Sequence, residues 1–291
     1  MQASIIRSHD QYLSSNYNSK TIVWDARWPD LPGTKPVLIF LHGFKGFKDW
    51  GTFDRICDHL ALQDLIVVRV NFSHNGATPE NPTEISDSEA FGLNNFTIEL
   101  DDLAMVMDQI QNGHHSIPRN LIEPGRFILM GHSRGGSTAI LKAAEDPRVF
   151  LLITLSAVAD FETRYSPDIL REWEKNGVIY VENSRTGQQY PLYYQLYQNT
   201  IENRNRLYIP YAASKVSVPW LIVQGTGDQT VSVENARQLL EKNDHAKVFF
   251  IEGADHTFGG SHPYHLPQLP DDTVLMLDKV SSFIASGKQL K

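Results

Sequence analysis

Short apolar runs alternate with helical patterns along most of this chain of 291 residues, and this alternation constrains its fold more than any other feature. The apolar runs are 37–41, 65–70, 127–130, 149–155, 220–223 and 247–251. The helical patterns lie at 53–60, 100–110, 231–240 and 274–284. Strands buried on both faces read as nearly continuous apolar runs, and parallel strands need crossover connections. The alternation therefore predicts an α/β fold with a mostly parallel central sheet and helices on both faces.

The composition is that of a globular protein, with 41% hydrophobic and 21% charged residues. It excludes the disordered, collagen-like and coiled-coil classes. The longest apolar run, 149–159, is too short to cross a bilayer, so we expect no membrane partner. The first residues lack a basic head followed by an apolar stretch, which predicts no secretory signal and a cytoplasmic location.

Charge and cysteine content narrow the kinds of partner and cofactor. The net charge is −8 and no block of basic residues is present, so we expect no nucleic-acid partner. The single cysteine, Cys57, excludes a disulfide framework and a multi-cysteine zinc site, and its spacing predicts a buried helix residue. We therefore expect a small-molecule substrate, no metal and no organic cofactor. The sequence leaves the oligomeric state open.

One stretch, 160–211, breaks the alternation and predicts an inserted cap, with the core formed by 1–159 and 212–291. A short helix near 169–175 and a strand pair around the turn at 184–187 are expected within it. The stretch holds eight of the 11 tyrosines of the chain. Aromatic rings serve equally well as a small satellite core or as a ligand-facing surface. For the ligand-facing alternative, the expected substrate-binding residues are Tyr180, Tyr190, Tyr193, Tyr194 and Tyr197.

The sequence Gly-His-Ser-Arg-Gly-Gly follows the apolar run 127–130 and opens a helical segment, with Ser133 at its centre. In this setting G-x-S-x-G predicts a sharp turn that needs the two glycines, Gly131 and Gly135, and that holds the serine hydroxyl exposed on a strained backbone. The start of the following helix favours negative charge nearby. Ser133 is thus the candidate nucleophile.

A serine hydroxyl needs an oriented base, and the chain offers one after a strand, with a carboxylate after the preceding strand. Asp228 follows the run 220–223 in Gly-Thr-Gly-Asp, and His256 follows 247–251 in Gly-Ala-Asp-His. Because the carboxyl ends of parallel strands meet at one edge of a sheet, Ser133, Asp228 and His256 can come together. Asp160, which starts the insertion, is the weaker alternative for the acid.

The run 37–41 ends in His42-Gly43-Phe44, at the same expected edge of the sheet. The backbone N–H of Phe44 and that of Arg134, the residue after the candidate nucleophile, can converge on a developing oxyanion.

Together, the segments HGFKG, GHSRGG, GTGD and GADH resemble those of the α/β-hydrolase superfamily, from about Lys35 to the C-terminus. Within it, the chain is similar to dienelactone-hydrolase-like proteins and to cinnamoyl or feruloyl esterases, and the latter carry an inserted subdomain where 160–211 lies. The resemblance implies the α/β-hydrolase fold and the roles given above for the nucleophile, base, acid and oxyanion donors. The chain departs from many relatives in the loop 71–76 and in having Arg134 where cinnamoyl esterases usually have glutamine.

We therefore expect a serine hydrolase that cleaves carboxylic esters, including aromatic acyl esters, through an acyl-enzyme. The same triad also serves the cleavage of amide, thioester or lactone bonds. A ligand-binding protein without catalysis on a hydrolase scaffold is the alternative from a different class.

Overall fold

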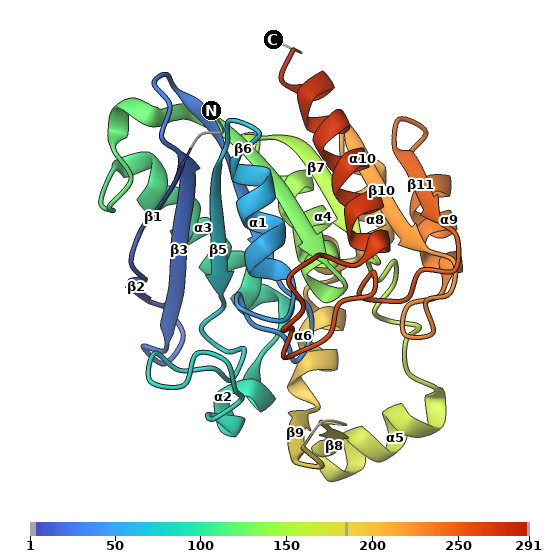
Figure 1. Cartoon of the computed structure of the whole chain (residues 1–291). Coiled ribbons are helices and arrows are strands. Elements are labelled where there is room, and N and C mark those ends of the chain that lie inside the picture. The colour runs from blue at the N-terminus through green and yellow to red at the C-terminus, as the bar shows by residue number, and fades with distance from the viewer. Residues whose placement is uncertain (1–3, 184–185, 290–291) are drawn as a thin grey trace.

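A computed structural model describes residues 4–183 and 186–289. Its main sheet has the strand order β1-β3-β5-β4-β6-β7-β10-β11 (Figure 1). The remaining strand, β2, pairs with residues 21–24 of β3, whereas β1 pairs with residues 27–29. From β5 to β11 neighbouring strands are parallel, which confirms the predicted sheet. The parallel strands are β4 (Lys35–Leu41), β5 (Ile66–Asn71), β6 (Ile122–His132), β7 (Val149–Leu155), β10 (Trp220–Gly225) and β11 (Lys247–Ile251).

The apolar runs became central strands because both of their faces are covered. Every residue of β4, β5 and β10 is buried. Alternate residues of β4 point to opposite sides: Leu38 and Phe40 pack into one apolar cluster, and Ile39 and Leu41 into the other. The two layers of helices enclose the sheet between them.

One layer consists of α1 (Phe53–Ala61) and α10 (Asp271–Gly287), which lie side by side in front of the sheet in Figure 1. Cys57 is fully buried in α1, as its spacing predicted. The other layer contains α3 (Phe96–Asn112), α4 (Arg134–Glu145) and α9 (Val233–Lys242). The helix expected at 100–110 is confirmed, and the Asn95 side chain caps α3 by accepting a hydrogen bond from the backbone N–H of Ile98. Two short elements, α2 (Ser88–Leu93) and η1 (Arg119–Leu121), lie in the connections on either side of α3.

Three strands before Lys35 were not predicted from the sequence. These are β1 (Ile5–Arg7), β2 (Gln11–Ser14) and β3 (Thr21–Pro29). Both β1 and β2 pair antiparallel with β3, and β3 pairs antiparallel with β5, so the N-terminal segment extends the sheet. The pattern hid β3 because Asp25 and Arg27 interrupt its apolar residues, although both charged side chains are buried.

The insertion contains α5 (Pro167–Asn176), the hairpin β8 (Val178–Glu182) and β9 (Gln189–Tyr193), α6 (Gln195–Glu202), α7 (Arg204–Leu207) and α8 (Ile209–Lys215). The expected helix and strand pair are both present; Ser184 and Arg185 of the expected turn lie outside the described residues. Figure 1 shows α5, β8 and β9 beyond the edge at which the parallel strands end. The expected boundary after residue 211 falls inside α8, which packs against α4 and α9. The division into core and cap therefore stays a prediction.

Candidate active site

The candidate residues follow the carboxyl ends of parallel strands, at the lower edge of the sheet in Figure 1. Ser133 directly follows β6, Asp228 follows β10 and His256 follows β11. Phe44 lies in the connection between β4 and α1. The parallel topology thus brings residues from distant parts of the sequence to one edge of the sheet.

The turn at Ser133 is as tight as the sequence predicted. Ser133 has φ 55° and ψ −123°, a backbone conformation that L residues rarely adopt. A Cβ on Gly131 would lie 2.1 Å from the carbonyl oxygen of Gly135. A Cβ on Gly135 would lie 2.4 Å from the carbonyl oxygen of His42. Only glycine fits at these two positions, since the contacts are with backbone that cannot yield.

Asp228 orients His256. The Nδ1–H of His256 donates a hydrogen bond of 2.8 Å to Oδ2 of Asp228. The other oxygen, Oδ1, accepts hydrogen bonds of 2.8 Å from the backbone N–H groups of Thr230 and Val231. Burial raises the pKa of Asp228, but the hydrogen bonds from His256 and Val231 outweigh it and hold that pKa below its usual value. The carboxylate is therefore ionised and fixed in position, and it sets which ring nitrogen of His256 carries the proton.

The carboxylate of the alternative acid, Asp160, binds a backbone group two residues further along the chain. Its Oδ1 accepts a hydrogen bond of 2.8 Å from the backbone N–H of Glu162. Among the described residues, Asp228 is the carboxylate bonded to His256.

Ser133 and His256 line the same cavity, which has a volume of about 420 Å³. No hydrogen bond joins Ser133 Oγ to His256 within the described residues, and such contacts are often looser before substrate binds. The neighbouring His132 supports the loop: its Nε2–H donates a hydrogen bond of 2.8 Å to the backbone carbonyl of His256. Burial lowers the pKa of His132 to about 3, so its ring is neutral at physiological pH. Its position beside the serine in the sequence gave no sign of this role.

The two expected oxyanion donors flank Ser133. Phe44 and Ser133 line the same cavity, and a Cβ on Gly43 would lie 2.9 Å from the Ser133 Cβ. Within the described part of the chain, the backbone N–H groups of Phe44 and Arg134 donate no hydrogen bond to another protein group. Both amides are therefore free to receive a ligand oxygen.

The side chain of Arg134 is buried and turned toward α3. Its Nε donates a hydrogen bond of 2.7 Å to Glu99, and its guanidinium carbon lies 4.3 Å from the ring centroid of Phe96. Glu99 also accepts a hydrogen bond of 2.7 Å from the Thr138 hydroxyl. This arrangement ties the start of α4 to α3, and the helical pattern of α3 alone could not reveal that Glu99 faces inward.

A second cavity, of about 220 Å³, also borders Ser133 and Phe44. Its wall is mainly apolar and includes the rings of Phe96, Phe161 and Tyr165. Phe161 contacts both neighbours edge to face, with ring centroids 5.3 Å from Phe96 and 5.7 Å from Tyr165. Two cavities of different size and polarity thus meet at the candidate nucleophile.

The five tyrosines expected to bind substrate lie elsewhere: the described lining of both cavities contains none of them. Tyr190 is buried against Phe91, and Tyr193 donates a hydrogen bond of 2.6 Å to Glu89. Tyr194 packs against Trp173 and Tyr197, whereas Tyr180 is 64% exposed. This placement favours the satellite-core alternative for the packed rings. The tyrosine that does line the smaller cavity is Tyr165, which the sequence analysis did not single out.

Within residues 4–183 and 186–289, no cluster of three or more histidine, cysteine, aspartate or glutamate side chains could hold a metal ion. In the same described ranges, no helix combines the length and apolar character needed to cross a bilayer.

Comparison with known proteins agrees with this architecture. A family model described as the alpha/beta hydrolase family matches residues 38–266. Mouse monoglyceride lipase is 24% identical, with 87% of this chain and 84% of the relative covered. Est1E from Butyrivibrio proteoclasticus has a TM-score of 0.67 at 18% identity, covering 96% of this chain and 99% of that chain. The monoacylglycerol lipase of Paleococcus ferrophilus has a TM-score of 0.65 at 13% identity, covering 91% and 99%.

Proposed function

This chain belongs to the alpha/beta hydrolase family, and we propose that it is a serine hydrolase that cleaves carboxylic esters through an acyl-enzyme on Ser133. The observation that carries the proposal is the Asp228–His256 pair, whose histidine lines the same cavity as a serine on a strained turn. A nucleophile, an oriented base and an acid are the parts that acyl transfer needs. Relatives named as monoglyceride lipases and a solved complex of Est1E with ferulic acid support the choice of an ester bond.

In the proposed mechanism, Ser133 Oγ attacks the ester carbonyl carbon while Nε2 of His256 takes the hydroxyl proton. The electron pair of the carbonyl bond moves to its oxygen, which the N–H groups of Phe44 and Arg134 stabilise. When the intermediate collapses, the bond to the alcohol oxygen breaks and His256 gives that oxygen its proton. Water then repeats the sequence on the acyl-enzyme, which releases the acid and restores Ser133.

The two cavities differ in which part of the ester they can hold. Because His256 must protonate the leaving oxygen, the alcohol lies in the larger cavity, which His256 lines. The acyl group then lies in the smaller cavity beside Arg134. Its volume of about 220 Å³ and its ring-lined wall suit a flat, rigid acyl group better than a long flexible chain.

The wall of the acyl cavity favours an aromatic acyl group. Phe44, Phe96, Phe161 and Tyr165 surround it with rings, and well-placed ring pairs contribute about 0.5–1.5 kcal/mol each. This preference rests on these four rings, and not on the five tyrosines that the sequence analysis singled out.

Replacement of Ser133 by alanine tests the nucleophile. Ser133→Ala should fold normally but lose about 10⁴-fold or more in kcat toward a p-nitrophenyl ester, since the catalytic groups act as a unit. A fluorophosphonate probe should label wild type and not the variant. Ser156→Ala is the matched control: Ser156 is fully buried after β7, outside the lining of both cavities, and this variant should keep both activity and labelling. Equal labelling of Ser133→Ala and wild type would place the nucleophile elsewhere.

Asp228→Asn tests the acid. The amide can still accept from the Thr230 and Val231 N–H groups, but it no longer fixes the tautomer of His256, so kcat should fall by about 10⁴-fold. Asp160→Asn should have a far smaller effect. The opposite ranking of kcat values would transfer the role of the acid to Asp160.

A comparison of two substrates tests the acyl preference. The ratio of kcat/KM for a methyl hydroxycinnamate to that for methyl decanoate should favour the aromatic ester by about ten- to a hundredfold. Phe161→Leu should lower this ratio by about two- to tenfold, because one ring contact is lost. Tyr180→Leu, a change at an exposed ring outside both cavities, should leave it unchanged. The aromatic preference is contradicted if the wild-type ratio favours methyl decanoate. It is also contradicted if Phe161→Leu leaves the ratio unchanged.

A further inference from the structure

The connection between β4 and α1, residues 42–52, carries Phe44 and borders both cavities. It has no ladder or helix of its own to fix its shape. Its backbone is closed by isolated turn hydrogen bonds, such as those of 3.0 Å from Gly46 N–H to Gly43 and 3.1 Å from Trp50 N–H to Phe47. The position of the Phe44 amide therefore depends on side chains that hold this connection from outside.

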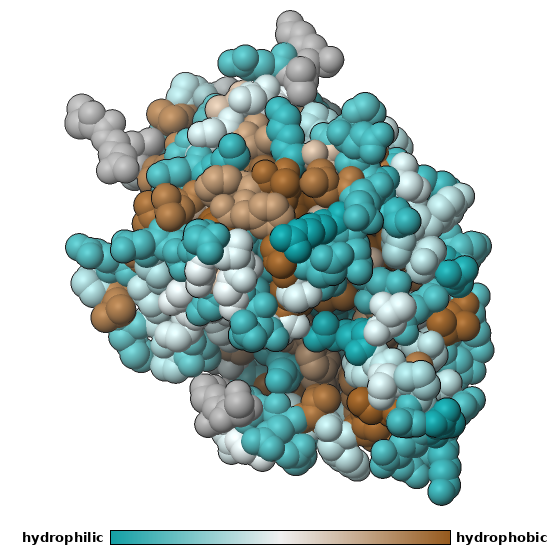
Figure 2. Space-filling view, turned by 90° about the vertical axis from the view of Figure 1, so that its right-hand side faces the viewer, coloured by the Kyte–Doolittle hydropathy of each residue, from teal (hydrophilic) through white to brown (hydrophobic). Residues whose placement is uncertain are grey.

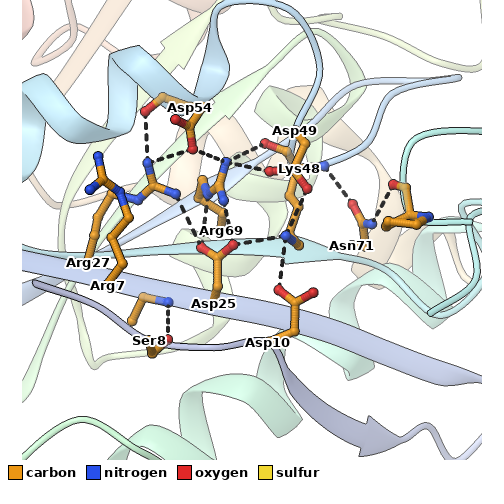
Figure 3. A network of polar contacts seen from close by, with 12 residues as sticks. Arg7, Ser8, Asp10, Asp25, Arg27, Lys48, Asp49, Asp54, Arg69 and Asn71 are labelled. Carbon is orange, nitrogen blue, oxygen red and sulfur yellow. Dashed lines mark hydrogen bonds and ion pairs between the residues drawn. The ribbon is translucent and has the colours of Figure 1, made fainter. Parts of the chain in front are cut away.

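Lys48, only 4% exposed, is the main attachment point. Its Nζ lies 2.9 Å from Asp25, 2.8 Å from Asp49 and 3.0 Å from Asp10 (Figure 3). Its backbone is held as well: the N–H of Lys48 donates a hydrogen bond of 2.6 Å to Oδ1 of Asn71. One residue of the connection is thus fixed through both its side chain and its main chain.

Two partners of Lys48, Asp25 and Asn71, are held rigidly because they belong to the strands β3 and β5. Asp25 of β3 lies opposite Arg69 of β5 in the antiparallel register, and both nitrogens of one edge of the Arg69 guanidinium bond to the Asp25 carboxylate. Arg69 Nη1 also donates a hydrogen bond of 3.2 Å to the carbonyl oxygen of Lys48. Figure 3 shows these side chains converging between β3, β5 and the start of α1.

Asp25 and Lys48 stay ionised at neutral pH. Burial raises the pKa of Asp25, but the hydrogen bond and charge of Arg69, with the charge of Lys48, bring it below its usual value. Burial lowers the pKa of Lys48, but the charges of Asp25 and Asp49 bring it above its usual value. The ammonium group and its carboxylates thus stay charged together.

The part of the connection that precedes Lys48 is held by a second side chain, Asn75. The side-chain amide of Asn75 donates a hydrogen bond of 3.3 Å to the carbonyl oxygen of Gly46 and lies 3.3 Å from Nε2 of His42. Phe44 lies between His42 and Gly46, so the segment that carries the oxyanion donor is held on both sides.

We propose that Lys48 is a positioning residue of the oxyanion hole: through Asp25 and Asn71 it fixes the connection that carries the Phe44 amide beside Ser133. This role rests on the proposed function. Oxyanion donors act on the transition state, and loss of one such donor lowers kcat by about 10²–10³-fold. A donor that is displaced but still present should cause a smaller loss than its removal. The loss should appear in kcat, while KM changes little.

The test compares Lys48→Met, Lys48→Arg and Asn71→Ala with wild type. Lys48→Met should lower kcat by about 10–100-fold with little change in KM, and affinity for a trifluoromethyl ketone, which mimics the tetrahedral intermediate, should fall in parallel. Lys48→Arg, which keeps the positive charge, should recover most of the lost kcat. Asn71→Ala leaves the ion cluster intact, so it measures the main-chain attachment even if Lys48→Met folds poorly.

Lys35→Met is the matched control. Lys35 is fully buried at the other end of β4, where its Nζ donates to the carbonyl oxygens of Leu31, Pro32 and Gly33. This variant should lower the Tm and leave kcat and inhibitor affinity unchanged.

Two kinds of failure are distinguishable. If Lys48→Met and Asn71→Ala keep wild-type kcat when assayed below their Tm, Lys48 serves only stability and the positioning role is wrong. If wild-type protein cleaves no ester and the fluorophosphonate probe leaves Ser133 unlabelled, the proposed function is wrong and the positioning role falls with it.

Discussion

At the turn that carries Ser133, the start of α4 lies in close contact with the ends of β4, β6 and β7, because glycines at the contacts leave no side chain in between. Gly135 lies so near the end of β4 that a Cβ would sit 2.4 Å from the His42 carbonyl oxygen, and a Cβ on Gly131 would sit 2.1 Å from the Gly135 carbonyl oxygen. A Cβ on Gly136 would lie 2.6 Å from the Cβ of Ala157, which follows β7. The start of α4 and the ends of three neighbouring strands are therefore locked together. The candidate nucleophile and the Arg134 amide inherit their positions from this contact, which also fixes the start of the connection that carries Phe44.

Much of the fold was predictable because the parallel strands bury both faces, and burial leaves a continuous apolar signal in the sequence. β3 shows where that signal fails. It lies near the edge of the sheet, between β5 and the short strands β1 and β2, and is almost entirely buried, yet its charged residues Asp25 and Arg27 read as exposed. Their partners lie far away in sequence: Asp25 pairs with Arg69 and Lys48, and Arg27 with Asp54 and Asp58. A local pattern cannot show that a charge will be buried against a distant opposite charge.

The same limit applies to the candidate site. Ser133, Asp228 and His256 could be singled out because each sits in a glycine-containing turn just past a strand, a local signal that topology converts into proximity. The residues that line the two cavities beside Ser133 had no such signal. Tyrosine count pointed to the hairpin, but Tyr190 faces Phe91 in a small core, whereas the tyrosine that lines the smaller cavity beside Ser133 is Tyr165. Which face of an inserted segment meets the core depends on its packing, and composition does not encode that.

Direct detection of the acyl-enzyme tests the central claim that Ser133 forms a covalent intermediate with the acyl group of an ester. Wild-type protein mixed with excess p-nitrophenyl ester and quenched in acid within the first turnover should gain the mass of one acyl group. Peptide mapping should place that group on Ser133, and p-nitrophenol should appear in a burst of one equivalent per protein. Steady turnover of the ester with no acylated protein, or with the acyl group on another residue, would contradict the account.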